Sequence, residues 1–237
     1  MKKYFKFSTF TMSLISLSFI FTACNDVIEN LDEREVMSKR FEESIEVAKN
    51  HSNMVDIIMQ SLARTRADGG DCQEALNNMF LDYIKENDLD DIFNTQESID
   101  RVVHPIDIAN EINKTIGNDF VDDLEQIIED ISDNESLRES LLNLLISNDN
   151  NQNIDDMLIM AGIAVDSYDY WKSQAETRSI LSIATRIVRA DVLSAGAFLC
   201  ECGAAALVTG ATPPGAGLVA LTAGFGSTYE AITMAYE

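Results

Sequence analysis

Basic side chains are scarce in this sequence. Its 237 residues include 17 lysines and arginines against 40 aspartates and glutamates, which gives a formal net charge of −23 at pH 7. A field of that sign repels phosphate backbones and anionic lipid headgroups, whereas it attracts basic peptides and cations without specificity. The composition therefore excludes nucleic acid as an expected partner.

Residue patterns that carry catalysis are also missing. There is no G-x-S-x-G elbow, no phosphate-binding glycine loop, no H-E-x-x-H and no C-x-x-C. Adjacent carboxylates such as Asp122 and Asp123 diverge on a helix and cannot face each other as glycosidase carboxylates do. We therefore expect a protein that is not an enzyme and uses no cofactor. A hydrolase whose site no motif reveals is the remaining catalytic alternative.

Metal-binding patterns are weak. The two histidines, His51 and His104, have no cysteine or acidic partner at a zinc-motif spacing. Because His104 directly precedes Pro105, we interpret it as a residue at the start of a helix. The polar loop 147–153 alternates acidic and amide side chains as a calcium loop does, but isoleucine and methionine stand where that loop requires glycine and glutamate. No metal site is predicted.

Cysteine is rare, with four residues in the chain. A helix would set Cys200 and Cys202 about 200° apart, which disfavours a bond between them. The pairing that remains joins Cys72 to Cys200 or to Cys202. Such a disulfide forms in an oxidising compartment. The alternative is that Cys200 and Cys202 are small apolar side chains in a tight helix seam.

The first 24 residues carry an export signal. Three lysines lie within residues 1–6, residues 7–20 are largely apolar, and residues 21–24 are Phe-Thr-Ala-Cys. This order is typical of a secretory signal, and the apolar run is too short to span a bilayer comfortably. The closing four residues resemble the lipobox at which signal peptidase II cuts bacterial lipoproteins. An ordinary secretory signal and an uncleaved anchor helix are the alternatives.

The resemblance implies an acylated Cys24 as the first residue of the mature chain, bearing fatty acids such as palmitate. Several acyl chains attach a protein stably to a membrane. Asn25 follows the cysteine, where lipoproteins kept at the inner membrane commonly have Asp, so the resemblance implies the outer membrane. The acidic residues between 26 and 35 are similar to the export signals of surface-displayed lipoproteins. A periplasmic and a surface location both stay open.

Apolar residues recur at helical spacing along most of the chain, and alternating strand patterns are scarce. The sequence predicts an all-α protein, a multi-helix bundle or orthogonal helical array, with helices that average four turns or less. Boundary signals support this: Asp71 with Glu74 and Ser132 with Glu135 have capping-box spacing, and Pro105 suits the start of a helix that runs to Gly117.

Residues 176–237 form an apolar tail rich in alanine and glycine. Pro213 and Pro214 divide it into two arms, and five glycines recur every seven residues. Repeated glycine weakens a helix unless close backbone approach compensates for it. We predict a tightly packed helical hairpin. The repeating glycines are Gly196, Gly203, Gly210, Gly217 and Gly224.

The tail also resembles the glycine-rich hairpins of membrane-active bacteriocin peptides, which makes membrane insertion an alternative. Charged residues in the first arm, Asp191 and Glu201 among them, oppose insertion because an ionised side chain at mid-membrane depth is costly. We therefore expect the hairpin to pack on the body. An aromatic cluster, Tyr168, Tyr170 and Trp171, is interpreted as the anchor of a helix junction, with a ligand platform as the alternative.

The predicted organisation has four segments. A lipoprotein signal peptide precedes an acidic tether, an acidic helical body and the apolar hairpin. We expect a lipid-anchored cell-envelope protein that acts as an interaction or structural module on an unknown protein partner. The alternative function is a membrane-active or antagonistic protein that uses the hairpin. The segments are residues 1–23, 24–35, 36–175 and 176–237.

Overall fold

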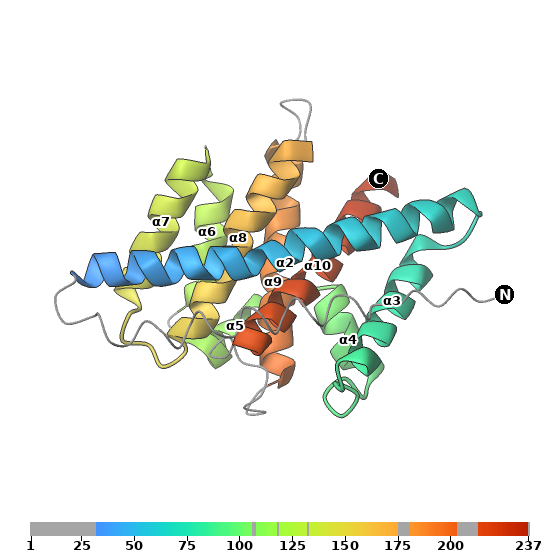
Figure 1. The fold of residues 1–237 in the computed structure, drawn as a ribbon, viewed down its shortest axis with the longest axis horizontal. Helices are drawn as coiled ribbons and strands as arrows, with labels where there is room; N and C mark the ends of the chain where they lie inside the picture. Colours follow the sequence, from blue (N-terminus) through green and yellow to red (C-terminus); the bar gives the residue numbers. More distant parts are fainter. Residues whose placement is uncertain are drawn as a thin grey trace.

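The computed structural model describes residues 32–105, 108–117, 119–131, 133–174, 181–202 and 213–236. These residues form nine helices and no strand, so the all-α prediction is confirmed (Figure 1). Cys24 and the lipobox lie outside the described residues. The helices are α2 (Glu33–Ala67), α3 (Cys72–Glu86), α4 (Gln96–Val103), α5 (Ala109–Ile116), α6 (Phe120–Glu129), α7 (Asn134–Ser147), α8 (Ile154–Gln174), α9 (Leu181–Cys202) and α10 (Pro213–Tyr236).

Helix α2 is much longer than predicted. It runs without a break for 35 residues, about 50 Å at the rise of an α-helix, and is far longer than the predicted average of four turns or less. Buried residues continue along one stripe from Met37 to Leu62, and no glycine or proline interrupts them. Acidic residues in its first turn and basic residues in its last turn suit the helix dipole.

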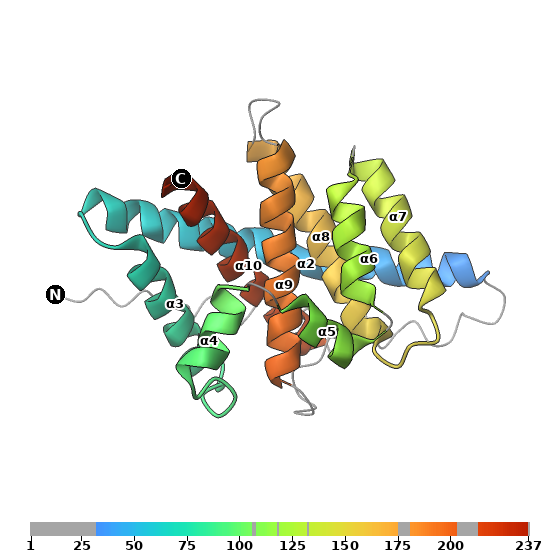
Figure 2. The same ribbon diagram turned by 180° about the vertical axis from the view of Figure 1, so that it is seen from behind.

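The helices form a compact array around α8 and α10. Both helices pack on α2 on one side and on α9 on the other, as the views from the front and from behind show (Figures 1 and 2). Helices α4 and α5 contact α9, while α7 contacts both α2 and α8. Gly162 permits the close crossing of α8 on α2, because a Cβ there would lie 2.8 Å from the carbonyl oxygen of Ser44.

Helix boundaries follow the predicted signals in part. The Asp71 carboxylate accepts the backbone N–H groups of residues 73 and 74 and caps α3. The cap of α7 is Asp133, one residue after the predicted Ser132, which lies outside the described residues. His104 is the C-cap of α4 and not the start of a helix, and α5 begins at Ala109 rather than near Pro105. The reason is that residues 96–103 already form a helix that ends there.

The glycines of the tail serve several interfaces rather than one seam. Added Cβ atoms would lie 2.7 Å from Ile112 of α5 at Gly196, and 3.3 Å from Met54 of α2 at Gly224. Close approach of α10 to α9 occurs instead at Gly226, where a Cβ would lie 2.8 Å from the Ala190 carbonyl oxygen. The single glycine seam is therefore wrong for Gly196 and Gly224, because α9 and α10 are each surrounded by several helices. Gly203 and Gly210 lie outside the described residues.

The apolar residues form one core that includes both tail helices. Buried side chains of α9 and α10, such as Phe198 and Phe225, pack in the same cluster as those of α2, α3 and α8. Among the described helices, none combines the length and apolar character needed to cross a membrane.

Candidate functional site

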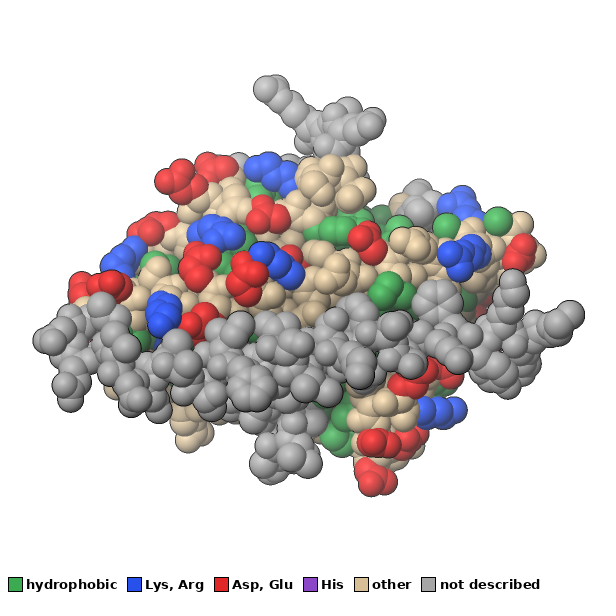
Figure 3. Space-filling view, in the orientation of Figure 1, with side chains coloured by type: hydrophobic (Ala, Val, Ile, Leu, Met, Phe, Trp, Pro, Cys, Tyr) green, Lys and Arg blue, Asp and Glu red, His purple; other side chains and the backbone are tan. Residues whose placement is uncertain are grey.

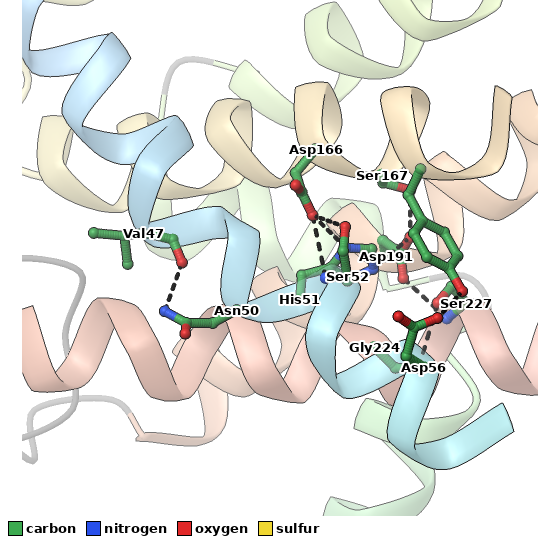
Figure 4. Close-up of polar contacts among 11 residues, drawn as sticks. Val47, Asn50, His51, Ser52, Asp56, Asp166, Ser167, Asp191, Gly224 and Ser227 are labelled. Carbon is green, nitrogen blue, oxygen red and sulfur yellow. Dashed lines mark hydrogen bonds and ion pairs between the residues drawn. The ribbon is translucent and has the colours of Figure 1, made fainter. Parts of the chain in front are cut away.

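A fully buried histidine lies between two aspartates at the centre of the array. His51 of α2 has no exposed surface; its Nδ1 lies 3.0 Å from Oδ2 of Asp166, and its Nε2 lies 3.0 Å from Oδ2 of Asp191. The Nδ1 contact is a hydrogen bond, whereas the Nε2 contact is an ion pair whose N–H is not well aligned with the carboxylate. Figure 4 shows the imidazole between the two carboxylates.

Hydroxyl and backbone N–H groups donate further hydrogen bonds to both carboxylates. Asp166 accepts hydrogen bonds from the backbone N–H of Ser52 at 3.2 Å and from its hydroxyl. Asp191 accepts a hydrogen bond from the hydroxyl of Ser167 and another from the backbone N–H of Ser227 at 3.1 Å. Buried charges need such partners. The cluster of His51, Ser52, Asp166, Ser167, Asp191 and Ser227 is called the histidine network below.

The network joins four helices because neighbouring residues of α8 point in different directions. Adjacent residues on a helix are about 100° apart, so Asp166 reaches α2 while Ser167 reaches Asp191 of α9. Ser227 brings in α10. The side chain of His51 thus extends between α8 and α10 to reach Asp191 of α9. Elsewhere along α2, these two helices lie between α2 and α9.

Electrostatics keep His51 charged. Burial of the ring lowers its pKa, but the charge of Asp191 and the hydrogen bond and charge of Asp166 outweigh burial and raise the pKa to about 9. The ring is therefore an imidazolium at neutral pH and donates a proton from each nitrogen toward a carboxylate.

This arrangement favours a structural role over a nucleophilic one. In a serine nucleophile the hydroxyl donates its proton to a neutral imidazole. Here the hydroxyls of Ser52 and Ser167 donate to carboxylates, and both imidazole nitrogens face carboxylates. His51 thus has no free nitrogen with which to act as a base, and it acts as an ionic cross-link between helices.

The predicted aromatic cluster splits into different roles. Tyr168 is buried in the core, with the Lys172 ammonium 5.2 Å from its ring centroid. The Tyr170 hydroxyl donates to Oδ1 of Asp56 at 2.7 Å and so ties α8 to α2. The Trp171 ring meets the ring of Tyr170 edge-on at 5.1 Å. These contacts match the interpretation of the cluster as a helix junction.

The other candidate residues lie apart from the network. The His104 ring packs on Tyr229 at 4.0 Å between centroids, and its pKa is lowered by burial, which the charge of Asp100 partly offsets. In the loop 147–153, the amide of Asn153 donates to the carbonyl oxygens of residues 115 and 116, and so binds the end of α5. Within the described ranges, no group of three or more His, Cys, Asp and Glu side chains is arranged to hold a metal ion.

The cysteines of the described residues are free thiols. Cys72 is buried at the start of α3, and Cys200 and Cys202 lie near the end of α9. Burial raises the pKa of Cys200, and it raises the pKa of Cys202 to about 12. A disulfide between Cys72 and Cys200 or Cys202 stays a prediction.

The chain matches no family model, no curated protein and no solved structure. Its function must therefore be inferred from its own residues and geometry.

Sequence reasoning missed the histidine network. It judged His51 by partners at zinc-motif spacing, whereas Asp166 is 115 residues away along the chain. One signal was present. Asp191 is an acidic residue within a long apolar segment, and a buried carboxylate of that kind requires a cationic or hydrogen-bonding partner.

Proposed function

We propose that this chain is a lipid-anchored cell-envelope protein that serves as an interaction or structural module and not as an enzyme. Cys24 carries the membrane anchor, and the acidic helical body meets a protein partner. Helices α9 and α10 form a hairpin that is part of the body.

The proposal rests on one observation, which is that the histidine network links four helices. His51 and Asp191 are fully buried and paired by charge, and with Asp166 and the serines they hold α2, α8, α9 and α10 together. Removing one member of such a buried charge pair typically costs about 3–5 kcal/mol. These groups therefore favour one rigid arrangement of helices, a property suited to a module that presents its surface to a partner.

The same contacts favour a packed hairpin over membrane insertion. Release of α9 would separate Asp191 from His51 and leave both charges without their partner. It would also break the ion pair between Arg189 of α9 and Glu125 of α6, whose charged atoms are 2.8 Å apart. In a bilayer Asp191 would have to be neutralised or paired again at a cost of several kcal/mol.

The distance to the membrane is set by the tether. Glu33, the first residue of α2, follows Cys24 by nine residues. A fully extended chain of that length reaches about 30 Å at most. The first turn of α2 therefore lies within about 30 Å of the bilayer in an acylated chain.

Surface charge indicates the chemistry of the partner. Ion pairs join α2 to neighbouring helices. Arg34 pairs with Glu139 of α7 at 2.6 Å, and Arg40 pairs with Asp155 of α8 at 2.7 Å. Basic and acidic side chains lie side by side on the face shown in Figure 3. Since acidic residues outnumber basic ones so strongly, such pairing leaves excess negative charge at the surface. A basic protein face fits it, with binding that weakens as salt rises.

The anchor is tested by fractionation and mass spectrometry. The wild-type chain should remain with the outer membrane and yield an N-terminal fragment that begins at acylated Cys24. The Cys24→Ala variant should be released from the membrane or remain unprocessed, whereas Cys72→Ala, a matched control, should behave as wild type. A mature fragment without acyl mass, or a Cys24→Ala protein processed and attached as before, would refute the anchor.

The interaction role is tested separately by crosslinking in intact cells, followed by purification of the complex. We expect a discrete partner with a basic surface, whose affinity for the purified chain falls as salt is raised from 50 to 300 mM, a change that shortens the Debye length about 2.4-fold. Binding that does not change with salt would contradict the assignment of an acidic docking surface.

A further inference from the structure

A small apolar cavity opens at the end of α2 that lies farthest from the tether. It measures about 280 Å³ and lies between α2, α3 and α10. Met59, Leu62, Ala63 and Arg66 line it from α2 at the spacing of a single helical stripe, and Cys72 with residues 231–232 completes the wall. The cavity is thus a product of three helices from distant parts of the chain.

An exposed methionine marks the mouth of this cavity. Met59 is 38 % exposed and is the one large hydrophobic side chain in the described part of the chain that is so exposed. Leu62 and Ile232 in the wall are buried. Methionine is flexible and adapts to apolar ligands of irregular shape. An apolar cavity beside an exposed, flexible methionine indicates a ligand-binding site.

A positive charge stands at the rim. Arg66 is exposed and has no carboxylate partner among the described residues, unlike Arg34 and Arg40. It follows Met59 by seven residues and therefore lies on the same face of α2. An aliphatic wall with a single arginine at its edge complements a ligand that has an aliphatic chain and a carboxylate head.

The position of the cavity points to a dissolved ligand rather than a membrane lipid. Leu62 lies about 43 Å along α2 from Glu33, and Glu33 is the described end nearest the tether. The volume is at the lower end of those of small-molecule sites, so the ligand is short. We propose that this cavity binds a dissolved, medium-chain aliphatic monocarboxylate, with the chain against Leu62 and Ile232 and the carboxylate on Arg66.

The choice of a dissolved ligand over a lipid rests on the proposed membrane anchor, whereas the cavity itself does not, and its test is separate. The full chain is held in phospholipid nanodiscs, or in the same buffer without them if it does not attach. The chain is first reduced and the reductant is removed, so that both cysteines are thiols. Alkylation of Cys72 by N-ethylmaleimide is then followed by peptide mass spectrometry, because Cys72 lines the cavity and Cys200 does not. The probe is decanoate below its micelle concentration, with butyrate and decyltrimethylammonium as controls for chain length and charge.

Decanoate should slow the alkylation of Cys72 about tenfold at ten times its Kd, because the site is then free about a tenth of the time. The rate at Cys200 should not change. Butyrate and decyltrimethylammonium should leave both rates as they are.

Variants test the arginine and the apolar wall of the cavity separately. Arg66→Glu should raise the decanoate concentration needed for half protection about fivefold or more, as expected for loss and reversal of an exposed charge contact. Arg64→Glu, the same change on the opposite face of α2, is the matched control and should leave that concentration unaltered. Ala231→Phe should fill the cavity and abolish protection, while Ala67→Phe, outside the cavity, should preserve it.

Three results would overturn the proposal. The first is that decanoate does not protect Cys72, and the second is equal protection by decyltrimethylammonium. The third is protection by the nanodisc lipid alone, which would assign the cavity to a bilayer lipid. Circular dichroism of each variant shows that its helices are intact, so a loss of protection reports on the site.

Discussion

Replacing His51 by alanine is expected to destabilise the protein severely. The change removes the cation between two carboxylates, one of which, Asp191, has no exposed surface. Breaking a buried ion pair by removing one partner costs about 3–5 kcal/mol. Because single domains are stable by about 5–15 kcal/mol, this one substitution would remove a large share of the total.

A second substitution separates lost packing from unpaired charge. His51→Leu retains apolar volume but leaves Asp191 unpaired, and adding Asp191→Leu removes the charge as well. The double variant should therefore be more stable than His51→Leu alone by about 1–3 kcal/mol. If the double variant is instead less stable than the single variant, the network does not carry the buried charge inferred here.

The pH dependence follows from the raised pKa of His51. Its pKa is about 9 in the folded protein, against 6.5 for the exposed residue of an unfolded chain. The folded state then binds the proton more tightly, so this contribution to stability is complete below about pH 6.5 and is lost as pH rises toward 9. The difference amounts to about 3 kcal/mol, since each pKa unit corresponds to about 1.4 kcal/mol.

The assay combines urea unfolding with NMR of the histidine rings. Unfolding of the Cys24→Ala chain is measured by circular dichroism at pH 6, 7.5 and 9, with His104→Gln as the control because the pKa of His104 is lowered instead. Since the chain has two histidines, this variant also assigns the His51 resonance. A His51 ring that titrates below pH 6.5, or an alanine variant destabilised by less than about 1 kcal/mol, would refute the reasoning.

Two further predictions concern packing and capping. Gly226→Ala should be less stable than Gly224→Ala by about 1–3 kcal/mol in urea unfolding. The methyl group added at Gly226 meets the carbonyl oxygen of Ala190, whereas the one added at Gly224 meets only side-chain atoms, which can adjust. Equal stabilities would contradict the close approach of α9 and α10. Asp71→Ala should cost about 1 kcal/mol through loss of the N-cap of α3, whereas Asp71→Asn should retain most of the stability; equal loss in both would exclude a capping role.

The sequence alone determined the helical class and many of the boundaries. Apolar residues at a spacing of 3.6 define helices whatever their partners are, which is why the stripe that includes Phe41 and Ile45 is buried as expected. The cap at Asp71 depends on the local backbone and was predicted from the sequence for the same reason. The length of α2 was missed because its buried stripe continues through His51, a polar residue whose partners lie on α8 and α9.

Tertiary structure decided the use of the buried polar groups. Asp166 and Asp191 meet His51 only because α8 and α10 pack between α2 and α9, and no local pattern records that arrangement. The same holds for the glycines of the tail: Gly196 faces α5 and Gly224 faces α2, although both belong to one seven-residue series. Spacing along the chain fixes which face of a helix a residue occupies, whereas the partner of that face depends on packing between distant segments.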